Sequence, residues 1–267
     1  MSRFPSDIEY AERGQGLALL FVPGSFSTGA VWKLVMDKLG KGYRFVTTSL
    51  LGYGATAERR PLSNATTAQQ TEVIDAVFER IGTPVHVIAH SYGGLSALAH
   101  ALHGKHKAAS LALVEANPLG ILRTAGDEAY YSMFGAMTQV YFAEFAAGKS
   151  HAARHVIDFY AGAGAFDALP QKVRDYVIAT TPSNIRDWSS GTPFAPPLTD
   201  YAKITAPTLV IRGGNSHPAM KRIAELLVAQ IPKARLATID AGSHFLPVTH
   251  PTRLAGLVAA HVKKSIT

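Results

Sequence analysis

The sequence predicts an α/β fold in which a mostly parallel β-sheet is covered by helices on both faces. Short apolar runs rich in β-branched residues alternate with segments whose apolar residues recur at helical spacing. This alternation stops between residues 119 and 198, where helical segments rich in alanine and aromatic residues follow one another without a convincing strand. The chain has 267 residues, of which 47% are hydrophobic and 17% charged, so it can bury a large core. We therefore expect a core formed by residues 1–118 and 199–267, with residues 119–198 inserted as a helical cap.

The individual elements follow from these patterns. Strands are expected at residues 8–12, 17–22, 43–50, 85–89, 110–115, 207–213 and 234–239. Core helices are expected at residues 30–39, 67–81, 95–102, 218–230 and 251–263, and cap helices at 127–147, 151–161 and 170–180. In a parallel sheet, functional side chains gather at the carboxyl ends of the strands. The loops that follow the strands are therefore the places to look for a site.

The most informative of these loops follows residues 85–89. The apolar run leads directly into Ser91, and a helical pattern starts immediately behind it. Such a tight strand–serine–helix turn needs small residues two positions before and after the serine, and Ala89 and Gly93 stand there. The turn exposes the serine hydroxyl and directs a helix N-terminus at any anion formed beside it.

Five motifs in the same order resemble the α/β-hydrolase fold superfamily over residues 10–262. They are L-L-F-V-P-G at 19–24, G-Y-G at 52–54, A-H-S-Y-G at 89–93, P-T-L-V-I-R-G at 207–213 and A-G-S-H-F-L-P at 241–247. The resemblance implies that Ser91 is a nucleophile and that His244 is its general base. A serine, rather than an aspartate, at this position argues against dehalogenase and epoxide hydrolase chemistry. The fold alone does not fix the reaction, because the superfamily includes many hydrolases, lyases and receptors.

The acid that should orient His244 departs from the common pattern. Many relatives place it in the loop after the strand at 207–213, but here residues 213–217 read G-G-N-S-H and contain no carboxylate. Some members of the superfamily take the acid from the end of the strand that follows the nucleophile helix, which corresponds to Glu115. A glutamate that closes a buried apolar strand also needs a partner. We therefore expect Glu115 to be the acid, with Asp240 or a cap residue such as Asp127 as alternatives.

The resemblance also indicates an oxyanion hole and a substrate pocket. The backbone N–H groups of Ser25 and Tyr92 are expected to form the hole. The pocket is expected to be apolar, which favours a small apolar or aromatic ester or lactone. Its candidate lining residues are Phe26, Tyr130, Phe134, Tyr160, Trp188 and Phe245.

These observations favour a cofactor-independent serine hydrolase of carboxylic esters or lactones. A C–C bond hydrolase of diketone-type substrates with the same triad is the nearest alternative, and cofactor-free oxygenation and cyanohydrin cleavage also remain open. From a different class, the chain could be a ligand-binding receptor or a pseudo-enzyme on this fold.

Composition bounds the remaining possibilities. The chain contains no cysteine, which excludes disulfides and thiolate ligands. No metal site is expected, because the spacing of His100, His103 and His106 is only a weak pattern. The net charge of +7 is scattered, so neither nucleic acid nor a membrane is an expected partner. The absence of a leader-like apolar segment favours a cytoplasmic protein. The oligomeric state cannot be predicted.

Overall fold

The computed structural model describes residues 4–266 and contains a seven-stranded sheet in the order β1-β3-β2-β4-β5-β6-β7. Strand β1 pairs antiparallel with β3, and all other neighbours are parallel. The strands are β1 (Ala11–Gly14), β2 (Leu17–Val22), β3 (Tyr43–Thr47), β4 (Val85–His90), β5 (Ser110–Val114), β6 (Thr208–Gly213) and β7 (Ala234–Ile239). This is the mostly parallel sheet that the sequence predicts.

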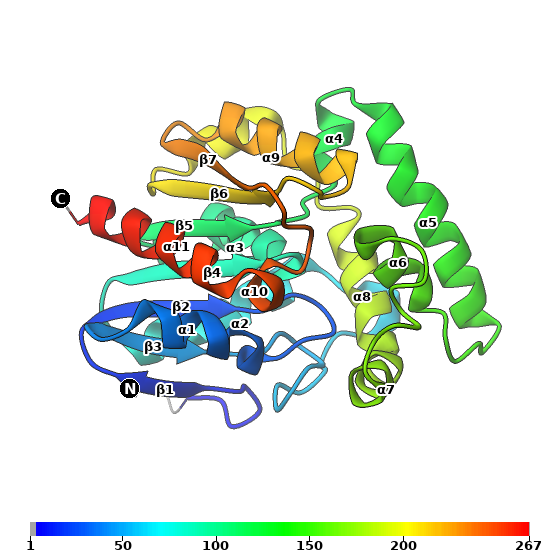
Figure 1. Ribbon diagram of the computed structural model, residues 1–267, viewed down its shortest axis with the longest axis horizontal. Helices are drawn as coiled ribbons and strands as arrows, with labels where there is room; N and C mark the ends of the chain where they lie inside the picture. The colour runs from blue at the N-terminus through cyan, green and yellow to red at the C-terminus, as the bar shows by residue number, and fades with distance from the viewer. Residues whose placement is uncertain (1–3, 267) are drawn as a thin grey trace.

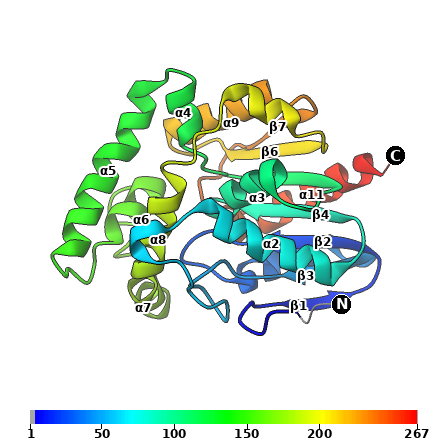
Figure 2. The same ribbon diagram turned by 180° about the vertical axis from the view of Figure 1, so that it is seen from behind.

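Helices cover both faces of this sheet. The front face in Figure 1 carries α1 (Lys33–Leu39), α10 (Leu246–Thr249) and α11 (Pro251–Ser265). The view from behind in Figure 2 shows α2 (Thr67–Ile81) and α3 (Tyr92–His103), and α9 (Pro218–Gln230) packs on β6 and β7. Short 3-10 helices η1 (Gly29–Trp32), η2 (Leu62–Asn64) and η3 (Leu198–Lys203) complete the core.

The two faces are set by the period of two along the strands. In β2, Leu20 packs with the cluster that includes α2 and α3, while its neighbours Leu19 and Phe21 pack with the cluster that includes α1 and α11. All three side chains are fully buried. Strands that are buried on both faces read as continuous apolar runs, which is why β2 and β4 are evident in the sequence.

A block of helices lies between β5 and β6 in the chain. It consists of α4 (Gly120–Thr124), α5 (Glu128–Ala146), α6 (Arg154–Ala161), α7 (Gln171–Ala179) and α8 (Thr181–Gly191). Figure 1 shows α5 to α8 together at one end of the sheet, away from the chain termini. Whether residues 119–198 act as a separate cap stays a prediction.

Several elements differ from the expectation. The short helices α4 and α10 were not predicted, and β3 ends at Thr47 rather than at residue 50. The first strand begins at residue 11 rather than 8, because the backbone of Glu9 bonds to the side chains of Thr48 and Thr56 instead of joining the sheet. Helix α8 has no counterpart among the predicted helices. Its sequence T-P-S-N-I-R-D-W-S-S-G is poor in strong helix formers. Burial of Ile185 and Trp188 outweighs this weak propensity.

Within residues 4–266, no helix is both long enough and apolar enough to span a membrane.

Candidate active site

Ser91 lies at the sharp turn between β4 and α3, as the motif predicts. Its backbone has φ 53° and ψ −125°, a strained conformation for a residue other than glycine. A Cβ on Gly93 would lie 2.2 Å from the carbonyl oxygen of Pro23, so only glycine allows the loop after β2 to approach this closely. The turn therefore brings the start of α3 and the Pro23 loop together around the Ser91 hydroxyl.

The structure connects Ser91, His244 and Glu115 by hydrogen bonds. The Ser91 hydroxyl donates to Nε2 of His244 at 2.9 Å, and Nδ1 of His244 donates to Oε2 of Glu115 at 3.2 Å. The three residues are 7%, 3% and 3% exposed, respectively, so the chain of bonds lies in a largely dry environment. These three side chains are thus arranged as a nucleophile, a base and an orienting acid would be.

Glu115 is held by the loop that lacks a carboxylate. Its Oε1 atom accepts hydrogen bonds from the backbone N–H of Gly213 and the hydroxyl of Ser216, both at 2.7 Å. Glu115 itself has a positive φ of 47°, which turns the chain sharply at the end of β5. The residues after β6 therefore supply donors to an acid that comes from the neighbouring strand.

The alternative acids lie elsewhere. Asp240 is exposed to solvent. Asp127 accepts a 2.7 Å bond from Nε of Arg222. Neither has a hydrogen bond to His244 among the bonds of the described residues.

The backbone donors expected for the oxyanion hole flank the same hydroxyl. Ser25 follows Gly24, where an added Cβ would lie 2.9 Å from Cβ of Ser91. Tyr92 is the first residue of α3, so its N–H is one of the free donors at a helix N-terminus. Across residues 4–266, neither N–H donates to a backbone carbonyl. Both groups are therefore available to a developing oxyanion.

His90 packs against His244. Its Nε2–H donates to the carbonyl oxygen of His244 at 2.8 Å, and the two rings are 5.0 Å apart. Complete burial, together with the neighbouring His244, lowers the pKa of His90 to about 3. His90 is therefore neutral near pH 7 and keeps the backbone of His244 in place without adding a charge.

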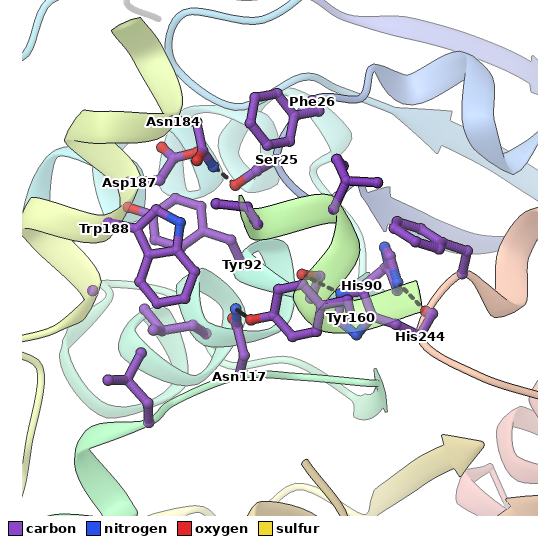
Figure 3. A pocket seen from close by; sticks show the side chains of 17 residues that line it. Ser25, Phe26, His90, Tyr92, Asn117, Tyr160, Asn184, Asp187, Trp188 and His244 are labelled. Atoms are coloured by element: carbon purple, nitrogen blue, oxygen red, sulfur yellow. Dashed lines mark hydrogen bonds between the residues drawn. The ribbon is translucent and has the colours of Figure 1, made fainter. Parts of the chain in front are cut away.

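A buried ion pair adjoins the loop that carries Ser25, one of the two expected oxyanion donors, and the sequence patterns do not reveal this pair. Asp187 of α8 accepts bonds from the hydroxyls of Ser25 at 2.6 Å and Tyr53 at 2.5 Å. Its other oxygen accepts a 2.7 Å bond from Arg60, whose side chain is fully buried. Figure 3 shows Asp187 and Ser25 facing each other at the edge of the pocket.

The charges of this pair compensate each other. Burial raises the pKa of Asp187, and Arg60 opposes that rise. Although burial disfavours the Arg60 charge, the carboxylates of Asp187 and Glu58 raise its pKa. Arg60 therefore holds the Asp187 carboxylate, which in turn accepts the hydrogen bond that fixes the Ser25 side chain.

A small cavity of about 40 Å³ is lined in part by Ser91 and His244. Figure 3 shows the side chains around this cavity. Four of the six expected pocket residues line it, namely Phe26, Tyr160, Trp188 and Phe245. The expectation was wrong for Tyr130 and Phe134, which do not line this cavity. Phe134 instead packs behind it against Phe159 and Trp188, so its large side chain supports the cavity wall. Tyr130 is partly buried against the core.

Polar residues that the sequence patterns did not single out also line the cavity. They are His90, Asn117, Asn184 and Asp187. Of these, His90 and Asn117 carried a signal that could have been used, because His90 directly precedes Ser91 and Asn117 follows Glu115 by two residues at a strand end. Asn184 and Asp187 lie on α8, and only the packing of that helix brings them to the cavity.

Comparison with known proteins agrees with this architecture. The family model described as "Alpha/beta hydrolase family" matches residues 19–257. A pimeloyl-(acyl-carrier protein) methyl ester esterase of Vibrio vulnificus (strain YJ016) is 30% identical over 113 residues. That match covers 42% of this chain and 42% of the relative, so less than half of the relative's length is represented.

Solved structures resemble the chain over nearly its whole length. A thermophilic esterase from Thermogutta terrifontis superposes with a TM-score of 0.75 and 19% identity, and the match covers 97% of this chain and 94% of that one. Est816, described as an N-acyl homoserine lactone degrading enzyme, gives a TM-score of 0.74 and 17% identity, with 95% and 96% covered. At these identities the likeness shows the fold. Together with the family match, which spans most of the sequence, it shows that this chain is a hydrolase belonging to the alpha/beta hydrolase family.

Proposed function

We propose that the protein hydrolyses carboxylic esters or lactones through an acyl-enzyme on Ser91. The observation that carries the proposal is the continuous hydrogen-bond chain from Ser91 through His244 to Glu115. The related Vibrio esterase supports an ester as the reacting group. The apolar side chains that line most of the cavity favour an apolar or aromatic substrate.

The geometry suggests how each group would act. As the Ser91 oxygen attacks the carbonyl carbon, Nε2 of His244 takes the hydroxyl proton. Glu115 keeps the other ring nitrogen protonated and stabilises the imidazolium that forms. The N–H groups of Ser25 and Tyr92 receive the oxyanion. His244 then returns the proton to the leaving alkoxide, and in the second half-reaction it activates the water that releases the acid.

The helices between β5 and β6 would act as a cap. Tyr160 of α6 stacks on the His244 ring with 4.0 Å between the centroids, and Trp188 of α8 lines the same cavity. At about 40 Å³, the cavity holds only a few water-sized groups, so an ester requires cap side chains to move. A cap of this kind would exclude water during acylation.

Labelling and kinetics test the proposal together. A fluorophosphonate probe should label the wild-type protein at Ser91, and short p-nitrophenyl esters should be hydrolysed. Ser91→Ala should abolish labelling and lower kcat by on the order of 10⁴ or more. Ser132→Ala is the matched control, because this exposed serine of α5 lies outside the cavity.

The alternatives give different results in the same experiment. Turnover of diketones but not of esters or lactones would identify a C–C bond hydrolase. Tight ligand binding with a ligand-dependent rise in melting temperature, but without turnover of any substrate, would identify a receptor. Either result would contradict the proposal.

A further inference from the structure

The Asn117 side chain lines the cavity and, among the described residues, has no hydrogen-bond partner for one of its two polar atoms. It follows β5 two residues after Glu115, lines the cavity and is 6% exposed. Its Nδ2 group donates to the hydroxyl oxygen of Tyr160 at 3.0 Å. Its Oδ1 atom is buried and has no hydrogen-bond partner within residues 4–266. Leaving such an acceptor unsatisfied is costly, so a native structure retains one only for a reason.

Tyr160 provides a complementary donor beside it. Because its oxygen accepts from Asn117, its own O–H proton remains available. Burial raises the pKa of Tyr160, so the phenol stays protonated. Figure 3 shows Asn117 and Tyr160 meeting at the edge of the pocket. The pair thus presents one acceptor, on Asn117, and one donor, on Tyr160. If the Asn117 amide is rotated by 180°, Asn117 supplies the donor and Tyr160 the acceptor.

The position of this pair relates it to the reacting atoms. The Tyr160 ring lies almost parallel to the His244 ring, at 14° and 4.0 Å. His244 in turn is bonded to Ser91 at 2.9 Å. A group that reaches both Asn117 and Tyr160 would therefore lie within a few bonds of the carbonyl carbon that Ser91 attacks. The cavity residues Leu119 and Val156 are apolar, so this part of the cavity calls for a polar substrate group only at Asn117 and Tyr160.

We propose that Asn117 and Tyr160 form a subsite for a neutral hydroxyl or amide N–H group close to the scissile carbonyl of the substrate. A single hydroxyl satisfies both residues, since it donates to Oδ1 of Asn117 and accepts from the Tyr160 O–H. Neither member of the pair is charged, so it does not offer an ion pair to an ionic substituent. The inference rests on the ester or lactone hydrolysis proposed above and narrows its substrate class.

Matched substrates test the subsite. The wild-type kcat/KM would be measured for methyl butanoate, methyl 2-hydroxybutanoate and methyl 3-hydroxybutanoate. At least one hydroxy ester should exceed the plain ester by roughly 5- to 150-fold, the factor that corresponds to about 1–3 kcal/mol for an unsatisfied buried partner. Asn117→Leu and Tyr160→Phe should each reduce that ratio toward one. Tyr160→Phe keeps the ring on His244, so it provides a second route if Asn117→Leu does not fold.

Tyr130→Phe is the matched control, because Tyr130 does not line the cavity. It should keep the wild-type ratio. A wild-type ratio near one for both hydroxy esters would overturn the subsite, and would mean that water satisfies Asn117. Failure to hydrolyse any of the three esters, together with no fluorophosphonate labelling, would instead refute the proposed function.

Discussion

Replacing Arg60 by methionine should destabilise the protein by about 3–5 kcal/mol, because it leaves the Asp187 carboxylate buried without a counter-charge. Asp187 is 2% exposed, and Arg60 is its cationic partner at 2.7 Å. The hydroxyls of Ser25 and Tyr53 would still donate to the carboxylate, but they carry no charge. Methionine fills a similar volume, so the loss should reflect charge rather than a cavity.

The stability lost in Arg60→Met should grow as the pH rises, because the buried Asp187 carboxyl must then ionise without its partner. Burial already raises the pKa of Asp187, and removing Arg60 removes the group that opposes the rise. Below the unfolded-state pKa near 4, the carboxyl is protonated in both states and its contribution is small. As the pH rises, the unfolded chain releases the proton more readily than the folded one. Each further pH unit then lowers the free energy of unfolding by about 1.4 kcal/mol, until the pH reaches the pKa of Asp187 in the folded state.

Urea unfolding at pH 4.5 and pH 7, followed by far-ultraviolet circular dichroism, measures this effect. The difference between wild type and Arg60→Met should be larger at pH 7. Arg60→Met combined with Asp187→Asn should regain at least half of the loss, because the neutral amide needs no counter-charge. Glu58 also loses a partner, but it is less buried and is present in both variants. If the double variant were as unstable as the single one at both pH values, the ion-pair reasoning would be wrong.

Three further predictions follow from the site. Glu115→Gln should lower kcat by about 10⁴, because it disturbs the imidazole tautomer of His244, whereas Asp240→Asn should leave kcat near the wild-type value. Steady-state kinetics of the two variants would show which carboxylate orients His244. The pKa of His90 is about 3 in the folded protein and about 6.5 in the unfolded chain, so between pH 6.5 and pH 5 the unfolded chain binds a proton that the folded protein does not. This difference should lower the free energy of unfolding of the wild type by about 2 kcal/mol over that range. The decline in the free energy of unfolding over the same range should therefore be smaller in His90→Asn. Gly93→Ala should destabilise by about 1–3 kcal/mol and abolish fluorophosphonate labelling, because its Cβ would meet backbone at 2.2 Å. Gly135→Ala, in the interior of α5 with open space around it, should instead stabilise by up to ~1 kcal/mol, and an unfolding curve equal for the two alanine variants would contradict the steric argument.

The sequence could indicate the three hydrogen-bonded residues because each lies at the end of a strand. Ser91, Glu115 and His244 follow β4, β5 and β7, and parallel strands bring such ends to one edge of the sheet. A buried glutamate with no local partner further indicated where a distant one was needed. Helices whose apolar residues recur at helical spacing were equally evident, as in α2, where Val73, Ile74 and Val77 are buried.

The helical block was less predictable for a physical reason. The direction in which a helical side chain points can be inferred only when the packing of its helix is known. For α5 to α8, no sheet register fixes that packing. Aromatic residues alone therefore could not distinguish Tyr160, which reaches His244, from Phe134, which packs behind the cavity. Asp187 was missed for the same reason, since it lies on a helix with weak propensity and its partners are 127 and 162 residues away in the chain.

The contacts of α6 and α8 differ in how costly they are to break, and from this difference we predict where a substrate would enter. Helix α8 is tied to the core through Asp187, and disrupting a buried ion pair costs about 3–5 kcal/mol. The Tyr160 side chain of α6 is held by its stacking on His244 and by one neutral hydrogen bond with Asn117, each of which contributes about 0.5–1.5 kcal/mol. Since the cavity is too small for an ester, it should enlarge by displacement of α6 while α8 stays with the loop that carries Ser25. Hydrogen exchange should therefore be faster across residues 154–161 than across residues 181–191, and the reverse order would place the opening at α8 and separate the Ser25 loop from the Arg60–Asp187 pair.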